Sequence, residues 1–261
     1  MKQNYELSQK QIRKSEMEKN ITQDSGVRLN KYLSDAGVCS RREADRLAEH
    51  GRITVDGIPA QPGTRVKPGQ LVRVDGKAVG ECPEKVVIAL YKPRGIVCTT
   101  DRAREKDNII DFMKYPERIY PVGRLDKDSE GLILLTNDGS LVNQILKGSL
   151  YHEKEYIVTV EKPVTEAFLK GMAAGVEIPD GMTRPCTVKK ISERTFSIIL
   201  TQGMNRQIRY MCRHFDYHVR RLKRIRIMNI TLGDLQTGKW RYVTPEELAK
   251  MKEMFGKDVR Q

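Results

Sequence analysis

A nine-residue loop, Gly123 to Gly131, holds several groups that could do chemistry. It contains three carboxylates and two basic side chains: Asp126, Asp128, Glu130, Arg124 and Lys127. An ionised, positioned carboxylate can attack as a nucleophile or remove a proton, and two carboxylates together can hydrolyse a glycosidic bond. An Asp in a loop also commonly closes a turn. The residue types alone therefore leave open both the role of the loop and the choice of carboxylate.

Apolar segments on both sides of the loop predict strands that position it. Ile119–Val122 precedes the loop, and Leu132–Thr136 follows it. A turn at Asn137-Asp138-Gly139 and a short helix from Leu141 to Leu146, ended by Gly148, come next. We therefore expect the candidate chemical groups between two apolar strands.

A second region, Thr201 to Asn229, is strongly basic. The chain carries a net charge of +13, and this segment, with eight basic residues and one acidic residue, accounts for +7 of it. A helix is expected from Asn205, with Ile208 and Met211 on its apolar face and Arg206, Arg209 and Arg213 on the opposite face. Clustered basic residues favour a polyanionic partner, so nucleic acid is the leading candidate.

The remaining elements after residue 84 predict a mixed α+β domain with a largely antiparallel sheet. The expected strands are Val86–Tyr91, Lys154–Val160 and Thr195–Leu200, and the expected helices are Val164–Ala174 and a closing helix that begins at Thr244-Pro245 and ends near Met254. Strands and helices do not alternate regularly. We place this domain at residues 84–256.

The N-terminal part predicts a small helix-helix-strand domain over residues 26–75. Apolar residues from Leu29 to Ala36 form one helix stripe, and Ser40 with Glu43 forms a capping box for a second helix over 41–50. The Asp56-Gly57 pair indicates a hairpin between short strands. Residues 1–25 are expected to be a poorly ordered polar leader, and residues 76–83 a linker.

Composition excludes several classes of protein. Among 261 residues, 39% are hydrophobic and 31% charged, which is typical of a globular chain. The longest apolar run, Val86–Tyr91, is far too short to span a membrane, and no signal peptide precedes it. Five cysteines without a Cys-x-x-Cys pattern favour a reducing cytoplasm. No motif for nucleotide-driven, nicotinamide or zinc-hydrolase chemistry occurs, so neither a cofactor nor a metal is implied. A monomer is expected.

Several separated motifs resemble one family. Gly123-Arg124-Leu125-Asp126, followed by Gly131 to Gly139, is similar to the catalytic motif of the RsuA-type ribosomal RNA pseudouridine synthases. The similarity extends to three further segments: Lys92–Gly95, Lys154–Tyr156 and Gly203–Arg209. The resemblance implies a cofactor-independent enzyme that isomerises uridine to pseudouridine in RNA.

The N-terminal domain also carries a resemblance. Arg28 to Tyr32 and Cys39 to Asp45 are similar to the RNA-binding domain named after small-subunit ribosomal protein four. Within the synthase family, the segments Asp107–Phe112, His152–Tyr156 and Arg226–Asn229 are most similar to members that modify the 23S RNA of the large subunit. The expected partner is therefore ribosomal RNA, either free or in an assembling subunit.

The resemblance also implies roles for individual residues. Asp126 is the expected catalytic carboxylate, Arg209 the arginine that pairs with it, and Tyr156 the aromatic ring that packs on the flipped-out base. Whether Asp126 attacks C1′ or removes a ribose proton is left open. Further RNA contacts are expected at two groups of residues: Arg124, Leu125, Lys127, Arg206, Gln207 and Ile208 near the site, and Arg28, Lys31, Arg41, Arg42 and Arg46 in the N-terminal domain.

Two alternatives remain at the level of sequence. A ribosome-associated RNA-binding protein without catalytic activity would have the same charge pattern. A nucleoside or glycoside hydrolase could use Asp126 with Asp128 or Glu130, and it would release free uracil, which an isomerase does not. Without the resemblance, Tyr156 could equally serve sheet packing, Arg209 could bind phosphate, and Asp126 could cap a turn.

Overall fold

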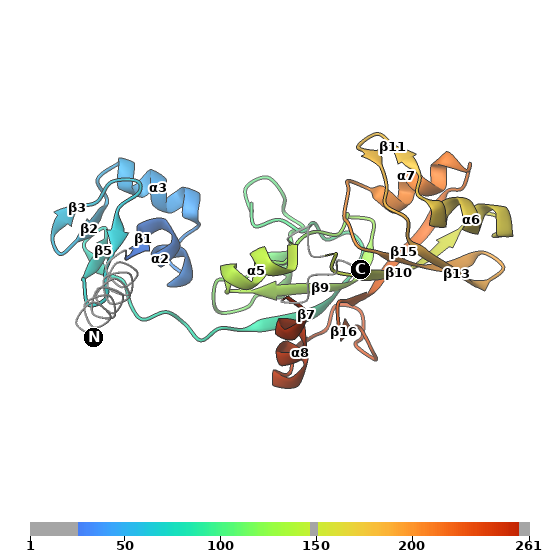
Figure 1. Cartoon of the computed structure of the whole chain (residues 1–261). Helices are drawn as coiled ribbons and strands as arrows, with labels where there is room; N and C mark the ends of the chain where they lie inside the picture. The colour runs from blue at the N-terminus through green and yellow to red at the C-terminus, as the bar shows by residue number, and fades with distance from the viewer. Residues whose placement is uncertain (1–25, 147–150, 256–261) are drawn as a thin grey trace, which may run out of the picture. The chain divides into compact units, whose positions relative to one another are not determined.

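The computed structural model describes residues 26–146 and 151–255. The chain divides into two compact units, with the boundary between Glu84 and Lys85. Figure 1 shows each unit with its own helices and strands. The predicted leader (1–25), the predicted helix end at Gly148 and the predicted domain end at residue 256 lie outside the described residues. No described helix is long and apolar enough to cross a membrane.

The N-terminal unit begins with the two predicted helices, α2 (Leu29–Asp35) and α3 (Arg41–Glu49). The hydroxyl of Ser40 accepts a hydrogen bond from the backbone N–H of Glu43, as the capping box predicts. Leu29 and Leu33 pack with Ala44 and Leu47 in a small core. The apolar faces of the two helices thus pack against each other, and the start of α3 is left exposed.

Short antiparallel strands complete this unit. The strands are β1 (Val27–Arg28), β2 (Ile53–Val55), β3 (Ile58–Pro59), β4 (Arg65–Val66), β5 (Val72–Val74) and β6 (Lys77–Ala78). β1 pairs with β4, and the other four form a sheet in the order β3-β2-β5-β6. Asp56 and Gly57 both have positive φ, which fits the predicted hairpin turn. β6 lies inside the predicted linker because Asp75 and Gly76, also at positive φ, form a second such turn. The linker prediction was therefore wrong at its start.

The second unit is built on a nine-stranded mixed sheet in the order β13-β14-β10-β15-β9-β7-β17, with β16 pairing to β15 and β8 to β9. Its strands are β7 (Val87–Lys92), β8 (Tyr120–Pro121), β9 (Glu130–Thr136), β10 (Lys154–Val160), β13 (Thr187–Ser192), β14 (Thr195–Leu200), β15 (Val219–Ile227), β16 (Ile230–Thr231) and β17 (Trp240–Tyr242). All described pairings in this sheet are antiparallel except β9 with β15. The predicted α+β class with a largely antiparallel sheet is confirmed. β11 (Glu177–Ile178) and β12 (Gly181–Met182) form a separate hairpin.

Helices cover both faces of this sheet. They are α4 (Ile109–Met113), α5 (Gly139–Leu146), α6 (Glu166–Ala174), α7 (Gln207–His214) and α8 (Pro245–Phe255). Apolar residues of α4, α6 and α7 pack with Leu90, Ile133 and Val158 on one face. α5 and α8 pack with Ala89 and Leu134 on the other. Figure 1 shows α6 and α7 beside β10 and β15. Because both faces are covered, β7 and β9 are buried along their whole length.

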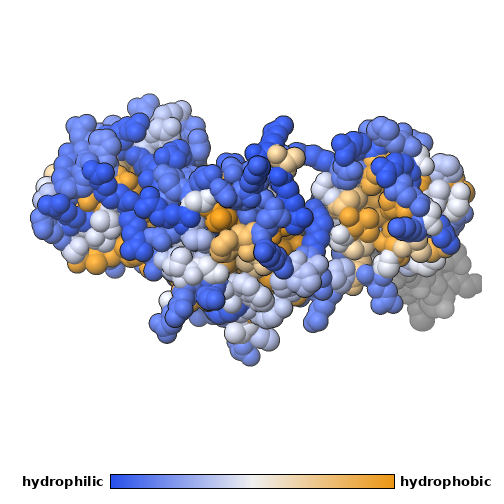
Figure 2. All heavy atoms as spheres, turned by 180° about the vertical axis from the view of Figure 1, so that it is seen from behind, coloured by the Kyte–Doolittle hydropathy of each residue, from blue (hydrophilic) through white to orange (hydrophobic). Residues whose placement is uncertain are grey.

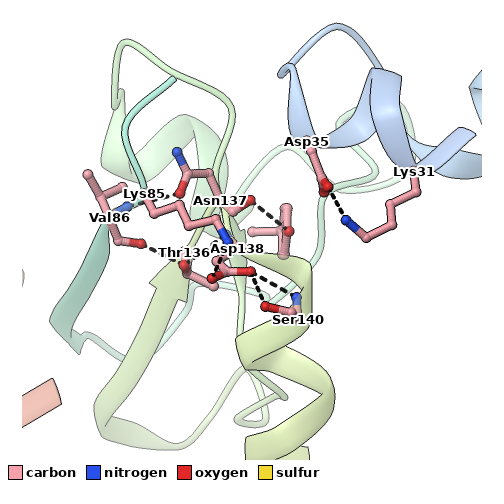
Figure 3. A network of polar contacts seen from close by, with 9 residues as sticks. Lys31, Asp35, Lys85, Val86, Thr136, Asn137, Asp138 and Ser140 are labelled. Atoms are coloured by element: carbon pink, nitrogen blue, oxygen red, sulfur yellow. Dashed lines mark hydrogen bonds and ion pairs between the residues drawn. The ribbon is translucent and has the colours of Figure 1, made fainter. Parts of the chain in front are cut away.

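The turn after β9 ties that strand to the start of β7. Thr136 donates its hydroxyl hydrogen to the carbonyl of Val86, and the Asn137 side-chain oxygen accepts from the Val86 N–H. Lys85 pairs with Asp138 at 3.0 Å, and Ser140 donates to the same carboxylate (Figure 3). These polar residues, three of which belong to the motif that follows the loop, therefore hold β9 and the start of β7 together.

Gly131 allows the sheet to close beside the candidate catalytic loop. A Cβ at this position would lie 2.2 Å from the backbone oxygen of Arg224, and the residue has φ +108°. β9 and β15 pair in parallel here, with Arg224 opposite Gly131. Any other side chain would push the two strands apart.

Candidate active site

Asp126 lies in the loop between β8 and β9, and buried groups from an adjacent segment hold that loop. The ammonium of Lys92 is fully buried and donates to the carbonyls of Pro93 and Ser129. Gly95 N–H donates to the Lys127 carbonyl at 2.7 Å, and Leu125 N–H donates to the Cys98 sulfur. Burial lowers the pKa of Lys92 and raises that of Cys98. The segment after β7 thus fixes the backbone on both sides of Asp126.

Two arginines at the start of α7 face this loop. Arg209 Nε lies 3.6 Å from Asp126 Oδ2, and Arg209 Nη2 lies 3.2 Å from Asp128 Oδ2. Nη2 also donates to the buried hydroxyl of Ser129 at 3.1 Å. Arg206 Nη1 is 3.9 Å from Asp126 and 3.6 Å from Asp128. Two guanidinium groups therefore hold two carboxylates in a partly buried cluster.

Arg209 of this cluster is less exposed to solvent than the two carboxylates that it faces. The Arg209 side chain is 14% exposed, whereas Asp126 is 28% and Asp128 43% exposed. Arg209 Nε makes no hydrogen bond among the described residues, and its distance to Asp126 exceeds hydrogen-bond length. In unliganded sites such contacts are often longer than in the substrate complex. The geometry leaves the Asp126 side chain partly open to a ligand, with the largely buried guanidinium of Arg209 behind it.

A cavity of about 470 Å³ lies in front of Asp126. Tyr156 on β10 lines it, with Lys154 two residues earlier on the same side of the strand. Leu200 and Met204 supply apolar wall. A polar carboxylate, an aromatic ring and apolar side chains in one concave site fit a small planar ring better than an extended chain.

A β-bulge beside the cavity gives two arginines of β15 different surroundings. Glu155 pairs with Arg226, but the next residue, Tyr156, pairs with Arg224, so Ile225 is an extra residue on β15. As a result Arg224 lines the cavity, whereas Arg226 lies beside Glu155 and Glu153 at 2.9 Å. Two arginines that simple alternation would place on one face therefore have different surroundings.

The structure brings most of the expected residues together around the cavity. Those that line it are Arg124, Leu125, Asp126, Tyr156, Arg206, Gln207 and Ile208. Lys127 instead points toward the segment before α4, at 3.5 Å from Glu105. Gln207 is buried, and its side-chain oxygen accepts from Met204 N–H, which gives it a capping role. The N-terminal residues belong to the other compact unit, where Lys31 pairs with Asp35 and Arg46 with Glu43.

Two expectations for the basic segment need correction. α7 begins at Gln207, two residues later than predicted, because Arg206 adopts a left-handed conformation with φ +48°. The charge of the segment is also not all available to RNA, since Arg221 pairs with the buried Glu130 and Arg226 with two glutamates. Hydrophilic side chains cover most of the surface seen in Figure 2, so hydrophilic character alone does not single out an RNA-binding face.

Four residues at the site escaped the sequence analysis as individual candidates: Lys92, Ser129, Lys154 and Arg224. Lys92 and Lys154 begin segments that the family resemblance includes, so that signal was present. Burial and neighbours define their roles, and neither is visible in a single sequence. No cluster of His, Cys, Asp or Glu suited to a metal occurs within the part of the chain that the structure describes.

Comparisons with known proteins agree with this geometry. The family described as RNA pseudouridylate synthase matches residues 86–214, and the S4 domain family matches residues 27–72. A crystal structure of a pseudouridylate synthase superposes with a TM-score of 0.63 and 25% identity, covering 87% of this chain and 100% of that one.

Sequence relatives give the same class. The dual-specificity RNA pseudouridine synthase RluF of Escherichia coli K12 is 54% identical over 86% of this chain and 78% of its own length. The ribosomal large subunit pseudouridine synthase B of Bacillus subtilis is 35% identical over 87% of this chain and 96% of its own length. The fold and the site thus define an enzyme that modifies RNA. The chain belongs to the RNA pseudouridine synthase family.

Proposed function

We propose that this chain isomerises a uridine of 23S ribosomal RNA to pseudouridine, with Asp126 as the catalytic carboxylate. The observation that carries the proposal is the largely buried Arg209 guanidinium 3.6 Å from Asp126 at a cavity lined by Tyr156. The names of the two relatives, one a dual-specificity RNA enzyme and one a large-subunit enzyme, support this substrate class.

The chain's own groups fit the steps of this isomerisation. The reaction breaks the N1–C1′ bond, turns the freed uracil and joins C5 to C1′. Arg209 keeps Asp126 ionised when substrate excludes water, since an opposite charge favours the charged form. In this proposal Tyr156 confines the ring by stacking, and its phenol assists loss of the C5 proton. None of these steps calls for a cofactor.

The N-terminal unit supplies affinity in this proposal. Arg41 and Arg42 at the start of α3 are exposed, as is Arg28 on β1, and RNA phosphate is the partner we assign to them. We further propose that the enzyme acts as a monomer in the cytoplasm, and that 76–83, shortened by β6, links two separately folded units at 26–75 and 84–256.

Tritium release tests the function directly. Wild-type enzyme is incubated with 23S and 16S fragments that carry tritium at uridine C5, with a transfer RNA included because the E. coli relative is named dual-specificity. We expect release from a 23S fragment and a pseudouridine product. Free uracil as product would favour the nucleoside hydrolase, and no release from any RNA would favour a binding protein without catalytic activity.

A further inference from the structure

Arg224 is a buried cation in the wall of the cavity, and one of its nitrogens lacks a hydrogen-bond partner within the described residues. Its side chain is part of a residue only 3% exposed. Nε donates to the Leu132 carbonyl at 2.7 Å, which fixes the guanidinium plane. Nη2 is buried and has no hydrogen-bond partner within the described residues. A buried donor without an acceptor costs about 1–3 kcal/mol, so its retention at a ligand site needs a reason.

Lys154 places a second cation on the same cavity wall. Its Nζ donates to the His152 carbonyl at 3.3 Å, and no described carboxylate lies within ion-pair distance. Burial, and then the charge of Arg224, lower the pKa of Lys154 to about 8. Lys154 and Arg224 therefore repel each other and have no anion between them.

The other buried or partly buried cations near the site are accounted for by their neighbours. Lys92 donates to two carbonyls and holds the catalytic loop. Arg209 faces Asp126 and Asp128. Lys154 and Arg224 alone among these four line the cavity beside the Tyr156 ring, whose centroid lies 6.0 Å from Arg224 Cζ, and lack a carboxylate partner.

We propose that Lys154 and Arg224 form the subsite that binds the carbonyl oxygens of the uracil ring and stabilises the uracil anion after the glycosidic bond breaks. This inference rests on the proposed function. When the N1–C1′ bond breaks, its electron pair leaves with N1, whether Asp126 bonds to C1′ or removes a ribose proton. The charge spreads over N1 and the two carbonyl oxygens. It is neutralised when C5 bonds to C1′, because the electron pair then returns to the Asp126 carboxylate as its bond to C1′ breaks, or to C2′ as it takes back the abstracted proton. C5 then gives its proton to a base, and N1 takes one up.

The placement explains why two unpaired cations are useful there. Preorganised donors in a site that excludes water stabilise developing charge far more than the same groups in water. The cations need not move during the reaction because the bulge fixes Arg224 beside Tyr156. The same pair retains the detached ring while it turns, since an anion between two cations does not escape readily.

Single-turnover kinetics tests the subsite. Lys154→Met and Arg224→Met are compared with Lys223→Met, which removes a charge from the same strand but on the opposite face, where Lys223 lies over the Tyr91 ring. With saturating enzyme and a labelled 23S fragment, we expect each subsite variant to slow tritium release about 100-fold with little change in RNA affinity. Lys223→Met should react at the wild-type rate. Subsite variants that react as fast as wild type would overturn the inference, whereas an inactive wild type would overturn the proposed function.

A binding measurement keeps the test independent of folding and turnover. 5-Nitrouracil is an anion at neutral pH, whereas uracil is neutral. Calorimetry in the Asp126→Asn background, which removes the opposing carboxylate, should show the nitro compound binding at least tenfold more tightly than uracil. Lys154→Met added to this background should abolish the preference. Equal binding of the two compounds before Lys154 is changed would contradict the anion subsite.

Discussion

One group of arginines in each unit shows how differently such side chains can be surrounded. In the unit that begins at Lys85, Arg209, Arg221 and Arg226 each lie within ion-pair distance of carboxylates of the same unit. In the N-terminal unit, Arg41 and Arg42 are exposed and make no ion pair within the described residues. The first group holds carboxylates of the sheet and of the candidate catalytic loop, and the second has no carboxylate partner within the described residues.

This difference changes how the net charge is interpreted. The segment from Thr201 to Asn229 carries more than half of the net charge, yet several of its arginines are matched by glutamates elsewhere in the chain. A basic side chain that is already paired with a carboxylate of the protein displaces few counterions from RNA when the protein binds. We therefore expect the small N-terminal unit to contribute more to RNA affinity than a count of basic residues suggests.

The largest effect is expected from the carboxylate that faces Arg209. Asp126→Asn keeps the shape and removes the charge, so tritium release should fall by more than about 1,000-fold, as for loss of a catalytic group elsewhere. RNA affinity should stay within about threefold of wild type, because Asp126 contributes no positive charge. Filter binding and single-turnover assays measure the two quantities separately.

Asp128→Asn is the matched control for this change. Asp128 shares both arginines with Asp126 but does not line the cavity. It should keep most of the activity. If the Asp128 variant were the inactive one and the Asp126 variant turned over normally, the catalytic role would pass to Asp128.

A second prediction concerns a carboxylate that pairs with β15. Glu130 is buried and accepts hydrogen bonds from Arg221 and Tyr91. Burial opposes its ionisation, but these partners outweigh burial and hold the pKa of Glu130 below its ordinary value. A depressed carboxyl pKa stabilises the fold above the unfolded value near 4.5 and loses that contribution as pH falls through the folded value.

Glu130→Gln should therefore lower the free energy of unfolding at pH 7 by about 1–3 kcal/mol. The difference from wild type should shrink as the pH falls below about 4, and the salt dependence of RNA binding should not change. Urea titrations at several pH values measure this. An equal deficit at pH 7 and pH 3 would show that the charge of Glu130 does not contribute.

Regular patterns in the sequence predict the parts of the fold that follow simple periods. β10 and β14 occupy the predicted residues because their apolar residues alternate without interruption. The capping residue Ser40 marks the start of α3 for a local reason. β13 and β15 were not predicted. β13 is exposed along almost its whole length, and the bulge at Ile225 breaks the alternation of β15.

The candidate site depends even more on contacts between distant segments. Asp126 and Arg209 were chosen by resemblance, since nothing local distinguishes Asp126 from Asp128. Arg224 is an arginine in a run of basic residues, and such residues are ordinarily exposed. Its burial follows from the pairing of β15 with β9 at Gly131, which no local pattern reveals.

The third prediction concerns the unpaired charges of α3. Arg41→Gln with Arg42→Gln should weaken RNA binding about tenfold and lower the slope of log affinity against log salt by about 1.5, as expected for two lost phosphate contacts. The rate at saturating RNA should stay at the wild-type value. Titrations at four salt concentrations give the slope.

Arg52→Gln is the matched control in the same unit. Arg52 is similarly exposed but pairs with Asp75 at 2.6 Å. If unpaired charge determines RNA affinity, this variant should keep the wild-type slope. A slope that falls equally for Arg52 would mean that ion pairing within the unit does not limit contact with phosphate.

The smallest effect is a change in where a protease cuts, and it tests whether the two units fold separately. The N–H of Val79 donates to the Val72 carbonyl, so β5 and β6 protect the chain as far as residue 79. Glu81 and Glu84 follow in an exposed stretch without regular structure. A glutamate-specific protease should therefore cut first at Glu81 or Glu84 and leave two stable fragments, each with cooperative unfolding. RNA affinity and its salt slope should remain partly with the N-terminal fragment, because Arg41 and Arg42 lie there. Early cleavage at Glu130 or Glu155, with the 80–85 stretch intact, would mean that the charges of the second unit are less tightly held than those of the first and would reverse the comparison.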